Sequence, residues 1–258
     1  MVKKYTLITG ATAGIGWELA RIIAQEGRPL ILVARDEQRL TQRQKELQQQ
    51  YSTPVEVLAK DLSICGAGAQ LYEDVLRQRW EVDTLINNAG FGLVGHFLHT
   101  DEQREQQMVH LNVMALQELT KLFARNFQRQ GGGRILNVAS TAAYLPGPYM
   151  AVYYATKAFV LSFSEALFYE LRPHGITVTT LVPGPTATEF QKRAGLGKVK
   201  LTRFLVMMDA ASVARAGYKG LQQGKRVVIP GVLNKLSVWS LRFMPRALAA
   251  QMIGWLQQ

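Results

Sequence analysis

Seven short apolar runs alternate along the chain with longer segments of helical period. The runs have the length of β-strands and lie at residues 5–9, 29–34, 55–59, 83–87, 134–140, 176–182 and 226–230. The helix-length segments between them lie at 15–26, 37–50, 67–80, 102–129, 152–172 and 210–222. Strands that are apolar throughout and alternate with helices predict a parallel sheet covered on both faces. Because parallel crossovers are right-handed, the pattern predicts an α/β fold with one doubly wound, seven-stranded parallel sheet.

Composition narrows the class of protein. The chain has 258 residues of which 48% are hydrophobic, enough to bury a substantial core. A single cysteine, Cys65, excludes an internal disulfide, and no cluster of Cys or His suggests a metal site. With no apolar signal-peptide region at the start, we expect a reducing, cytoplasmic location. The formal charge of +11 favours either an anionic partner or simple solubility, and no nucleic-acid-binding motif accompanies it.

The first strand ends in TGATAGIG, residues 9–16, where the chain must turn sharply into a helix. Gly10, Gly14 and Gly16 lack a Cβ, so the backbone can approach a pyrophosphate at the positive end of that helix. This arrangement predicts a dinucleotide site in a Rossmann fold. The spacing G-x-x-x-G-x-G differs from the general fingerprint, and a merely tight strand–helix turn is the structural alternative.

The glycine loop resembles the TGxxxGIG loop of the short-chain dehydrogenase/reductase family, and further motifs follow in the family's order. They are Asp61-Leu62, Asn87-Asn88-Ala89-Gly90, Asn112, Ser140, Tyr153-x-x-x-Lys157, Pro183-Gly184, Thr186 and Thr188. The resemblance covers roughly residues 4–230, and the stretch 144–190 is especially similar to bacterial members whose substrates are mostly unassigned. We expect a single domain over 1–258, with a cofactor-binding half at about 1–140 and a catalytic and substrate half at about 141–230. A C-terminal helical tail at about 231–258 would follow.

The resemblance also implies a set of cofactor contacts. They come from Gly10, Thr12, Gly14, Ile15, Gly16, Arg35, Asp61, Leu62, Asn88, Ala89, Gly90, Tyr153, Lys157, Pro183, Gly184, Thr186 and Thr188. In the family, Asp61 would accept a hydrogen bond from the adenine amino group, although an Asp after a strand is more often a cap. Asn88 would buttress neighbouring strands, while Ala89 and Gly90 leave room for the ribose.

The end of the second strand indicates which nicotinamide cofactor binds. NAD enzymes of this kind place an acidic residue here, whereas this chain has Ala34 and then Arg35, whose guanidinium suits a 2′-phosphate. Asp36 is expected to cap the next helix, and Arg39 adds positive charge one turn further on. Ala13 stands where some NADP-binding relatives have a basic residue, and a solvated surface arginine is the alternative interpretation of Arg35. We predict NADP(H).

Two adjacent tyrosines precede a lysine in AVYYATKAF, residues 151–159. On a helix, Lys157 neighbours both Tyr153, four positions before it, and Tyr154, three positions before it, so spacing alone leaves both open. The family's tyrosine lies thirteen residues after a strand-end serine, and Tyr153 stands at this distance from Ser140. By resemblance Tyr153 is therefore the catalytic residue, and Tyr154 is expected to be packing or interface surface.

The resemblance implies four catalytic residues, Asn112, Ser140, Tyr153 and Lys157. Ser140 would polarise the substrate oxygen, and Tyr153 would exchange a proton with it as general acid/base. Lys157 is expected to lower the pKa of Tyr153 and to bind the nicotinamide ribose. Asn112 would hold a water that relays protons from the lysine. The structural alternatives are a polar helix contact for Asn112, a cap for Ser140 and a core position for Tyr153.

Two segments fall outside the strand–helix alternation. Residues 185–208 are predicted to form a glycine-hinged lid over a hydrophobic substrate, with an ordinary helix pair as the alternative. Its apolar, glycine and basic members are Phe190, Leu196, Leu201, Phe204, Leu205, Val206, Met207, Met208, Gly195, Gly197, Lys192, Arg193, Lys198, Lys200 and Arg203. In the tail 232–258, Arg242, Pro245 and Arg246 argue against a transmembrane helix. Packing against protein is favoured there over a basic amphipathic membrane anchor.

These features predict an NADP(H)-dependent oxidoreductase that interconverts a small apolar ketone or aldehyde and its alcohol. A 3-oxoacyl thioester reductase is the narrower alternative, which the basic lid would support. A non-catalytic NADP-binding sensor or scaffold is the alternative of another class, and the intact Tyr153 and Lys157 count against it. By resemblance we expect a homodimer or homotetramer that pairs through the helices holding Asn112 and Tyr153.

Overall fold

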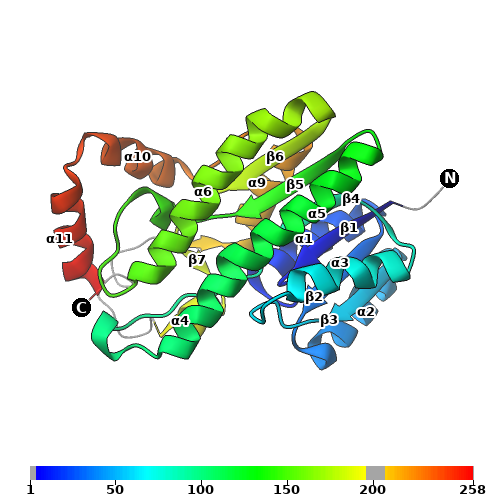
Figure 1. Ribbon diagram of the computed structural model, residues 1–258, viewed down its shortest axis with the longest axis horizontal. Helices are drawn as coiled ribbons and strands as arrows, with labels where there is room; N and C mark the ends of the chain where they lie inside the picture. Colours follow the sequence, from blue (N-terminus) through cyan, green and yellow to red (C-terminus); the bar gives the residue numbers. More distant parts are fainter. Residues whose placement is uncertain (1–3, 196–206, 258) are drawn as a thin grey trace.

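The main sheet confirms the predicted fold class. The computed structural model describes residues 4–195 and 207–257, and in these ranges seven parallel strands follow the order β3-β2-β1-β4-β5-β6-β9 (Figure 1). They are β1 Lys4–Thr9, β2 Leu30–Ala34, β3 Val55–Ala59, β4 Glu81–Asn87, β5 Gly133–Val138, β6 Ile176–Leu181 and β9 Val227–Val228. The reversal of strand order between β1 and β4 creates the crevice in which such sheets bind ligands.

Helices cover both faces of the sheet because successive strand residues point to opposite sides. Leu7 and Leu85 face one buried cluster, which includes side chains of α3 and α5. Ile8 and Ile86 face a second buried cluster, formed with α1, α2 and α9. These helices and the neighbouring pair are α1 Gly14–Gln25, α2 Glu37–Tyr51, α3 Ala67–Arg77, α4 Glu102–Val109, α5 Leu116–Arg129, α6 Ala151–Leu171 and α9 Ala210–Gln222.

Aspartates begin three of these helices. The carboxylate of Asp36 accepts a hydrogen bond from the backbone N–H of Arg39 at 3.0 Å, as its expected role as a helix cap requires. Asp101 and Asp209 cap α4 and α9 in the same way. Each cap satisfies an N–H group that the first helical turn leaves without a partner.

The predicted helix over 102–129 is interrupted. Between α4 and α5 the residues His110–Ala115 form a π-helical turn, η2, which carries Asn112. A single wide turn leaves the apolar period almost unchanged, so the sequence pattern does not reveal it. Such turns are frequent at functional sites.

Of the predicted lid, residues 185–208, the structure describes residues 185–195 and 207–208. The described portion holds β7 Thr186–Ala187, the short helix α7 Phe190–Ala194 and β8 Met208–Asp209, which pairs in parallel with β7. This small second sheet was not predicted, because two-residue strands carry no recognisable period. The remaining lid positions, Leu196, Gly197, Lys198, Lys200, Leu201, Arg203, Phe204, Leu205 and Val206, lie outside the described residues.

The tail is helical, as expected. It comprises α10 Val232–Ser240, the 3-10 turn η6 Leu241–Phe243 and α11 Arg246–Gln257. These elements lie at the end of the molecule opposite β3 and α2 (Figure 1). Among the described helices, none has the length and apolar character needed to cross a membrane.

Candidate active site

The glycine loop turns between β1 and α1 through two left-handed residues. Gly10 has φ 67° and Gly14 has φ 56°, conformations that residues with a Cβ adopt with strain. Gly16 is required for space, since a Cβ there would overlap the side-chain amide of Asn88. A cradle that side chains would fill, at the N-terminus of a twelve-residue helix, fits a pyrophosphate.

Thr9 and Asn88 tie this loop to the end of β4. The Asn88 amide donates to the carbonyl oxygens of Thr9 and Gly10 at 3.0 and 3.1 Å. The Thr9 hydroxyl in turn accepts from the backbone N–H groups of Asn88 and Ala89, both at 3.0 Å. The buttressing role expected of Asn88 is therefore met, and Thr9 is a second member that sequence reasoning missed.

Asn112 and Lys157 converge on Gly90. A Cβ at Gly90 would lie 3.0 Å from Asn112 Oδ1 and 3.5 Å from Lys157 Nζ, so glycine keeps this junction open. The Asn112 amide donates to the carbonyl of Phe91 at 2.9 Å and to the hydroxyl of Thr156 at 3.1 Å. The π-helical turn thus holds Asn112 firmly at the base of α6, next to the lysine.

Ser140 and Tyr153 meet beyond the carboxyl end of β5. Ser140 caps the short turn η3 Thr141–Tyr144, where its hydroxyl accepts from the backbone N–H of Ala142 at 3.2 Å. The same hydroxyl is a hydrogen-bond partner of the Tyr153 phenol. Ser140 is therefore a cap, as in the structural alternative, and its position beside Tyr153 is also the one that the catalytic interpretation requires.

Burial sets the protonation of the tyrosine and the lysine. Burial raises the pKa of Tyr153 above its usual value, and the hydrogen bond with Ser140 acts in the opposite direction. Burial lowers the pKa of Lys157 to about 8. The predicted lowering of the Tyr153 pKa by Lys157 is wrong in this structure. Desolvation outweighs the hydrogen bond with Ser140, and the Lys157 ammonium lies 5.9 Å from the ring centroid and donates to the Val138 carbonyl at 2.9 Å.

Tyr154 points to another part of the molecule. Its hydroxyl accepts a 2.8 Å hydrogen bond from the amide of Gln257 in α11, and both side chains are buried. Burial raises the pKa of Tyr154 to about 12, which Gln257 partly opposes. The rings of Tyr153 and Tyr154 meet edge to face, with centroids 6.1 Å apart. Tyr154 is a packing residue, as expected, and it fastens the C-terminal helix to α6.

The adenosine side of the predicted site lies at the ends of β2 and β3, whose last residues pair. Arg35 is exposed directly after β2. Asp61 follows β3, and its carboxylate accepts from the backbone N–H and the hydroxyl of Ser63 in the turn before α3; it is not the helix cap of the alternative interpretation, because the N-cap of α3 is Gly66. Arg39 makes a two-pronged ion pair with Glu189, at 2.6 and 3.0 Å. The charge of Arg39 is therefore neutralised by Glu189 of the lid segment, a pairing that the sequence did not indicate.

The remaining predicted contacts line the same sheet edge. Thr188 packs on the glycine loop, since a Cβ at Gly14 would lie 3.0 Å from its methyl group. Thr186 donates to the carbonyl of Gly184 at 2.9 Å, and the carbonyl of Pro183 accepts from Thr141 at 2.9 Å. Thr12 and Leu62 are buried, whereas Ile15 and Ala89 are half-buried against the two core clusters.

An apolar cluster surrounds Tyr153. Its ring lies 5.4 Å from that of Phe190 in α7, and Gly92 lets the chain pass close to both. Some further members are neighbours of Tyr153 in the chain, and others come from distant segments, which no local pattern indicated. They are Met108, Ala142, Met150, Tyr154, Ala194, Ile253, Phe91, Leu93, Val94, Leu145, Val152 and Leu256.

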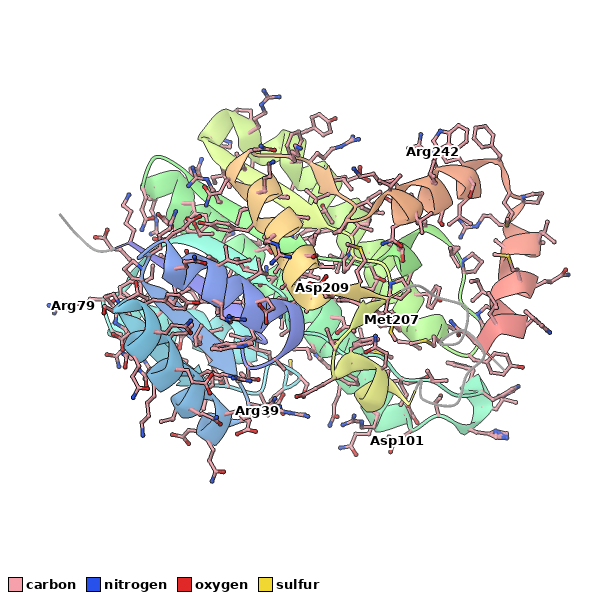
Figure 2. All side chains as sticks on the ribbon, turned by 180° about the vertical axis from the view of Figure 1, so that it is seen from behind. Arg39, Arg79, Asp101, Met207, Asp209 and Arg242 are labelled. Atoms are coloured by element: carbon pink, nitrogen blue, oxygen red, sulfur yellow. The ribbon has the colours of Figure 1, made fainter. Side chains whose placement is uncertain are left out.

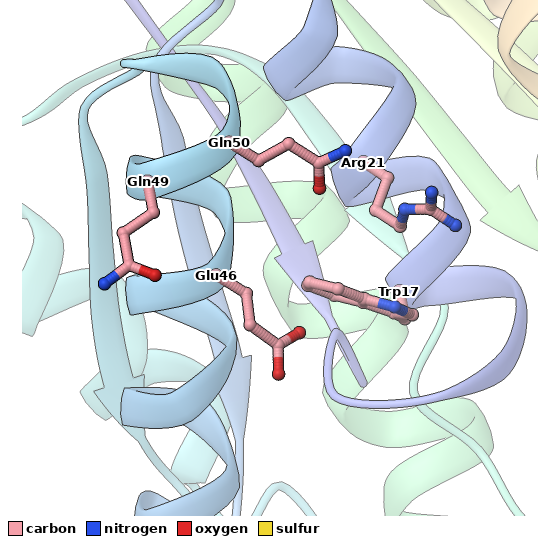
Figure 3. A pocket seen from close by; sticks show the side chains of 5 residues that line it. All are labelled: Trp17, Arg21, Glu46, Gln49 and Gln50. Atoms are coloured by element: carbon pink, nitrogen blue, oxygen red, sulfur yellow. The ribbon is translucent and has the colours of Figure 1, made fainter.

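A separate shallow pocket lies between α1 and α2 (Figure 3). Trp17 and Arg21 of α1 and Glu46, Gln49 and Gln50 of α2 line it, and Glu46 and Gln50 point toward α1. None of the predicted site residues lines this hollow. It therefore gives no reason to move the candidate active site from the sheet edge.

Comparison with known proteins identifies relatives. Residues 4–198 match the family described as short chain dehydrogenase. A short-chain dehydrogenase from Sphingobium yanoikuyae, solved in complex with NADPH, is 32% identical with a TM-score of 0.82, covering 96% of this chain and 99% of that one. The bulky-bulky ketone specific alcohol dehydrogenase from Comamonas testosteroni is 31% identical with a TM-score of 0.78, covering 96% and 98%. A very-long-chain 3-oxoacyl-CoA reductase of Meyerozyma guilliermondii is 33% identical, covering 69% of this chain and 55% of that protein.

Proposed function

The chain belongs to the short-chain dehydrogenase family, and from that premise we propose that it interconverts an apolar ketone or aldehyde and its alcohol with NADP(H). The observation that carries the proposal is the contact between Ser140 and the Tyr153 phenol, one helical turn from Lys157. This arrangement supplies a proton donor and a second hydrogen bond for one substrate oxygen.

The residues present fit a nicotinamide dinucleotide. Gly10, Gly14 and Gly16 would hold its pyrophosphate, and the buried Lys157 would bind its ribose. Arg35 would bind a 2′-phosphate, because its guanidinium is exposed at the end of β2 with no acidic residue in the place where NAD enzymes have one. The NADPH complex of the Sphingobium relative supports this choice.

The chain's own groups account for the handling of the proton. The cofactor, when bound, supplies or accepts the hydride at the carbonyl carbon. Ser140 orients the substrate oxygen towards the Tyr153 hydroxyl, which gives up its proton in reduction and recovers one in oxidation. Lys157 stabilises the phenolate that forms, and Asn112, held by Phe91 and Thr156, lies beside Lys157 to pass protons onward.

The apolar surroundings of Tyr153 favour an apolar substrate. Met150, Phe190 and Ile253 belong to the cluster around it, and apolar walls with few polar groups are typical of sites for hydrophobic small molecules. The Comamonas relative, which is specific for bulky-bulky ketones, supports this class.

A 3-oxoacyl thioester is the second candidate substrate, which the Meyerozyma relative favours by its name. Turnover of acetoacetyl thioesters at rates above those of simple ketones would select it. A non-catalytic NADP-binding sensor is the remaining alternative. It would be supported by protein that binds NADPH and turns over no carbonyl compound.

Turnover of a panel of apolar ketones and aldehydes with NADPH tests the proposal. Tyr153→Phe should lower kcat/KM by about 10²- to 10⁴-fold, the usual contribution of a general acid, and leave NADPH affinity unchanged. Tyr154→Phe is the matched control and should retain most of the activity, since its hydroxyl bonds Gln257. Loss of turnover in the control alone would overturn the assignment.

A further inference from the structure

The C-terminal helices bury one side and leave an apolar side exposed. Val238, Ala249 and Ile253 are buried, whereas Trp239 is 60% exposed and Phe243 72% exposed. We call the exposed apolar side chains of α10, η6 and α11 the tail surface. Its members are Val232, Leu233, Leu236, Trp239, Phe243, Leu248, Met252 and Trp255. Monomeric proteins rarely leave such a concentration of large apolar groups in water without a partner.

The charge of the tail is one-sided. Lys235, Arg242 and Arg246 are exposed among the apolar residues, and the sequence holds no Asp or Glu after Asp209. In the adjoining helix α6, Glu165 is paired with Arg226 at 3.5 Å. The tail surface therefore combines apolar groups with unbalanced positive charge.

The aromatic residues add a third feature. Trp239 and Phe243 pack edge to face with centroids 5.0 Å apart, one turn from one another on the outside of the tail. Trp is enriched where proteins meet the boundary between lipid headgroups and acyl chains. Lysine and arginine side chains beside such residues reach the headgroups while their stems stay in apolar surroundings.

We propose that the tail surface binds the surface of a lipid bilayer that contains anionic headgroups. Trp239, Phe243 and the leucines beside them insert into the boundary region, and Lys235, Arg242 and Arg246 bind the headgroup phosphates. Attachment is peripheral, because no described helix is suited to cross a membrane. The inference concerns the location of the protein and does not depend on its substrate.

A second copy of the chain fits this surface less well. In a two-fold symmetric contact both copies use the same patch, so all six basic side chains, three from each copy, would be brought into one contact. The tail has no Asp or Glu side chain to pair with them, and like charges across an interface are unfavourable. Anionic lipid satisfies both the charge and the apolar groups.

Vesicle co-sedimentation of the full chain tests the proposal. The protein should sediment with phosphatidylcholine vesicles that contain phosphatidylglycerol, far less with phosphatidylcholine alone, and less as salt rises. Changing Lys235, Arg242 and Arg246 to Gln should weaken binding by about 100-fold, at roughly fivefold per charge. Trp239→Ser with Phe243→Ser should weaken it by at least about tenfold.

A matched control separates the tail from the overall charge. Lys45, Arg79 and Lys121 are exposed outside the tail, and Figure 2 places Arg79 at the opposite end of the molecule from Arg242. Changing these three to Gln removes the same charge and should leave most of the binding. Equal loss in both triple variants, or no binding by the parent, would overturn the proposal. A shift of the sedimentation coefficient of the vesicle-free protein on Trp239→Ser and Phe243→Ser would do so too, because it would show a second copy on this surface.

Discussion

Lys157 is almost fully buried, and its ammonium donates to the carbonyl of Val138 at 2.9 Å. Burial holds its pKa at about 8, well below the usual 10.5, so desolvation makes the charged form less favourable in the folded protein than in water. Tyr153 is shifted in the opposite sense for the same reason, since burial opposes its phenolate. Each shift favours the neutral form, and each is reduced when the two groups ionise together as a phenolate–ammonium pair.

The lowered pKa of Lys157 should make the free energy of unfolding depend on pH. Between pH 8 and 10.5 the unfolded chain holds this proton and the folded chain does not, so the contribution of Lys157 to stability rises with pH. Relative to Lys157→Met, the parent should gain about 3 kcal/mol of unfolding free energy from pH 7 to pH 10.5. Urea unfolding at a series of pH values measures this. The same comparison with the exposed Lys121→Met should show no such trend.

Arg35 is the residue on which cofactor choice depends. Arg35→Ala should reduce the preference for NADP over NAD by about tenfold to a hundredfold, the value of a lost charge-assisted hydrogen bond. Arg39→Ala should have a smaller effect, because Glu189 engages that guanidinium. Dissociation constants for both dinucleotides measure the two changes. Equal affinity of the parent for NADP and NAD would refute the predicted preference.

At the scale of the elements, the sequence did not predict the contacts that α11 makes with α6 and with the cluster around Tyr153. It closes the apolar cluster around Tyr153 through Ile253 and Leu256, and it bonds Tyr154 through Gln257. Gly254 of this helix lies beside Pro148, which is in the loop just before α6. The C-terminal helix thus supports α6, which carries Tyr153, from outside the main sheet.

A double-mutant cycle measures how much the hydrogen bond between Tyr154 and Gln257 contributes to the free energy of unfolding. Gln257→Ala and Tyr154→Phe should each lower the unfolding free energy by about 1 kcal/mol, and the double variant should lose less than the sum. The coupling arises because both changes remove the same buried hydrogen bond. Gln251→Ala, at an exposed position of α11, is the matched control and should cost little.

At the scale of the whole molecule, two surfaces suit different partners. The outer side of α6 exposes Phe159, which stacks on Phe163 with centroids 5.4 Å apart. Small exposed residues of the same helix would let another helix approach closely. They are Ala151, Ala155 and Ala158. This side is where the resemblance implies pairing of subunits, whereas the tail surface is the proposed lipid contact.

Substitutions on the two surfaces should differ in their effect on assembly. Phe159→Lys should convert a dimer or tetramer into smaller species, because it places a charge in an apolar contact. Phe243→Lys, on the tail surface, should leave the oligomeric state unchanged. Sedimentation velocity distinguishes the two. A reversed result would place the subunit contact on the tail and remove the case for lipid binding there.

Much of this protein follows from local patterns in its sequence. The alternation of apolar runs and helical segments predicted the parallel sheet, since burial on both faces demands apolar residues throughout each strand. The glycines of residues 9–16 predicted a close turn, since backbone conformation and missing Cβ atoms are local properties. The spacing of Ser140, Tyr153 and Lys157 selected one tyrosine by resemblance, and the structure brings these residues and Asn112 to one sheet edge.

What only the tertiary structure decided involves pairs far apart in the chain and the exclusion of water. Arg39 and Glu189, or Tyr154 and Gln257, meet because the sheet and tail bring their elements together, and no local period records such encounters. The direction of the Tyr153 pKa shift was mispredicted because desolvation depends on the whole surrounding cluster. In the same way, the sequence determined that the tail is apolar and basic, while packing decided which of its side chains remain exposed to meet a partner.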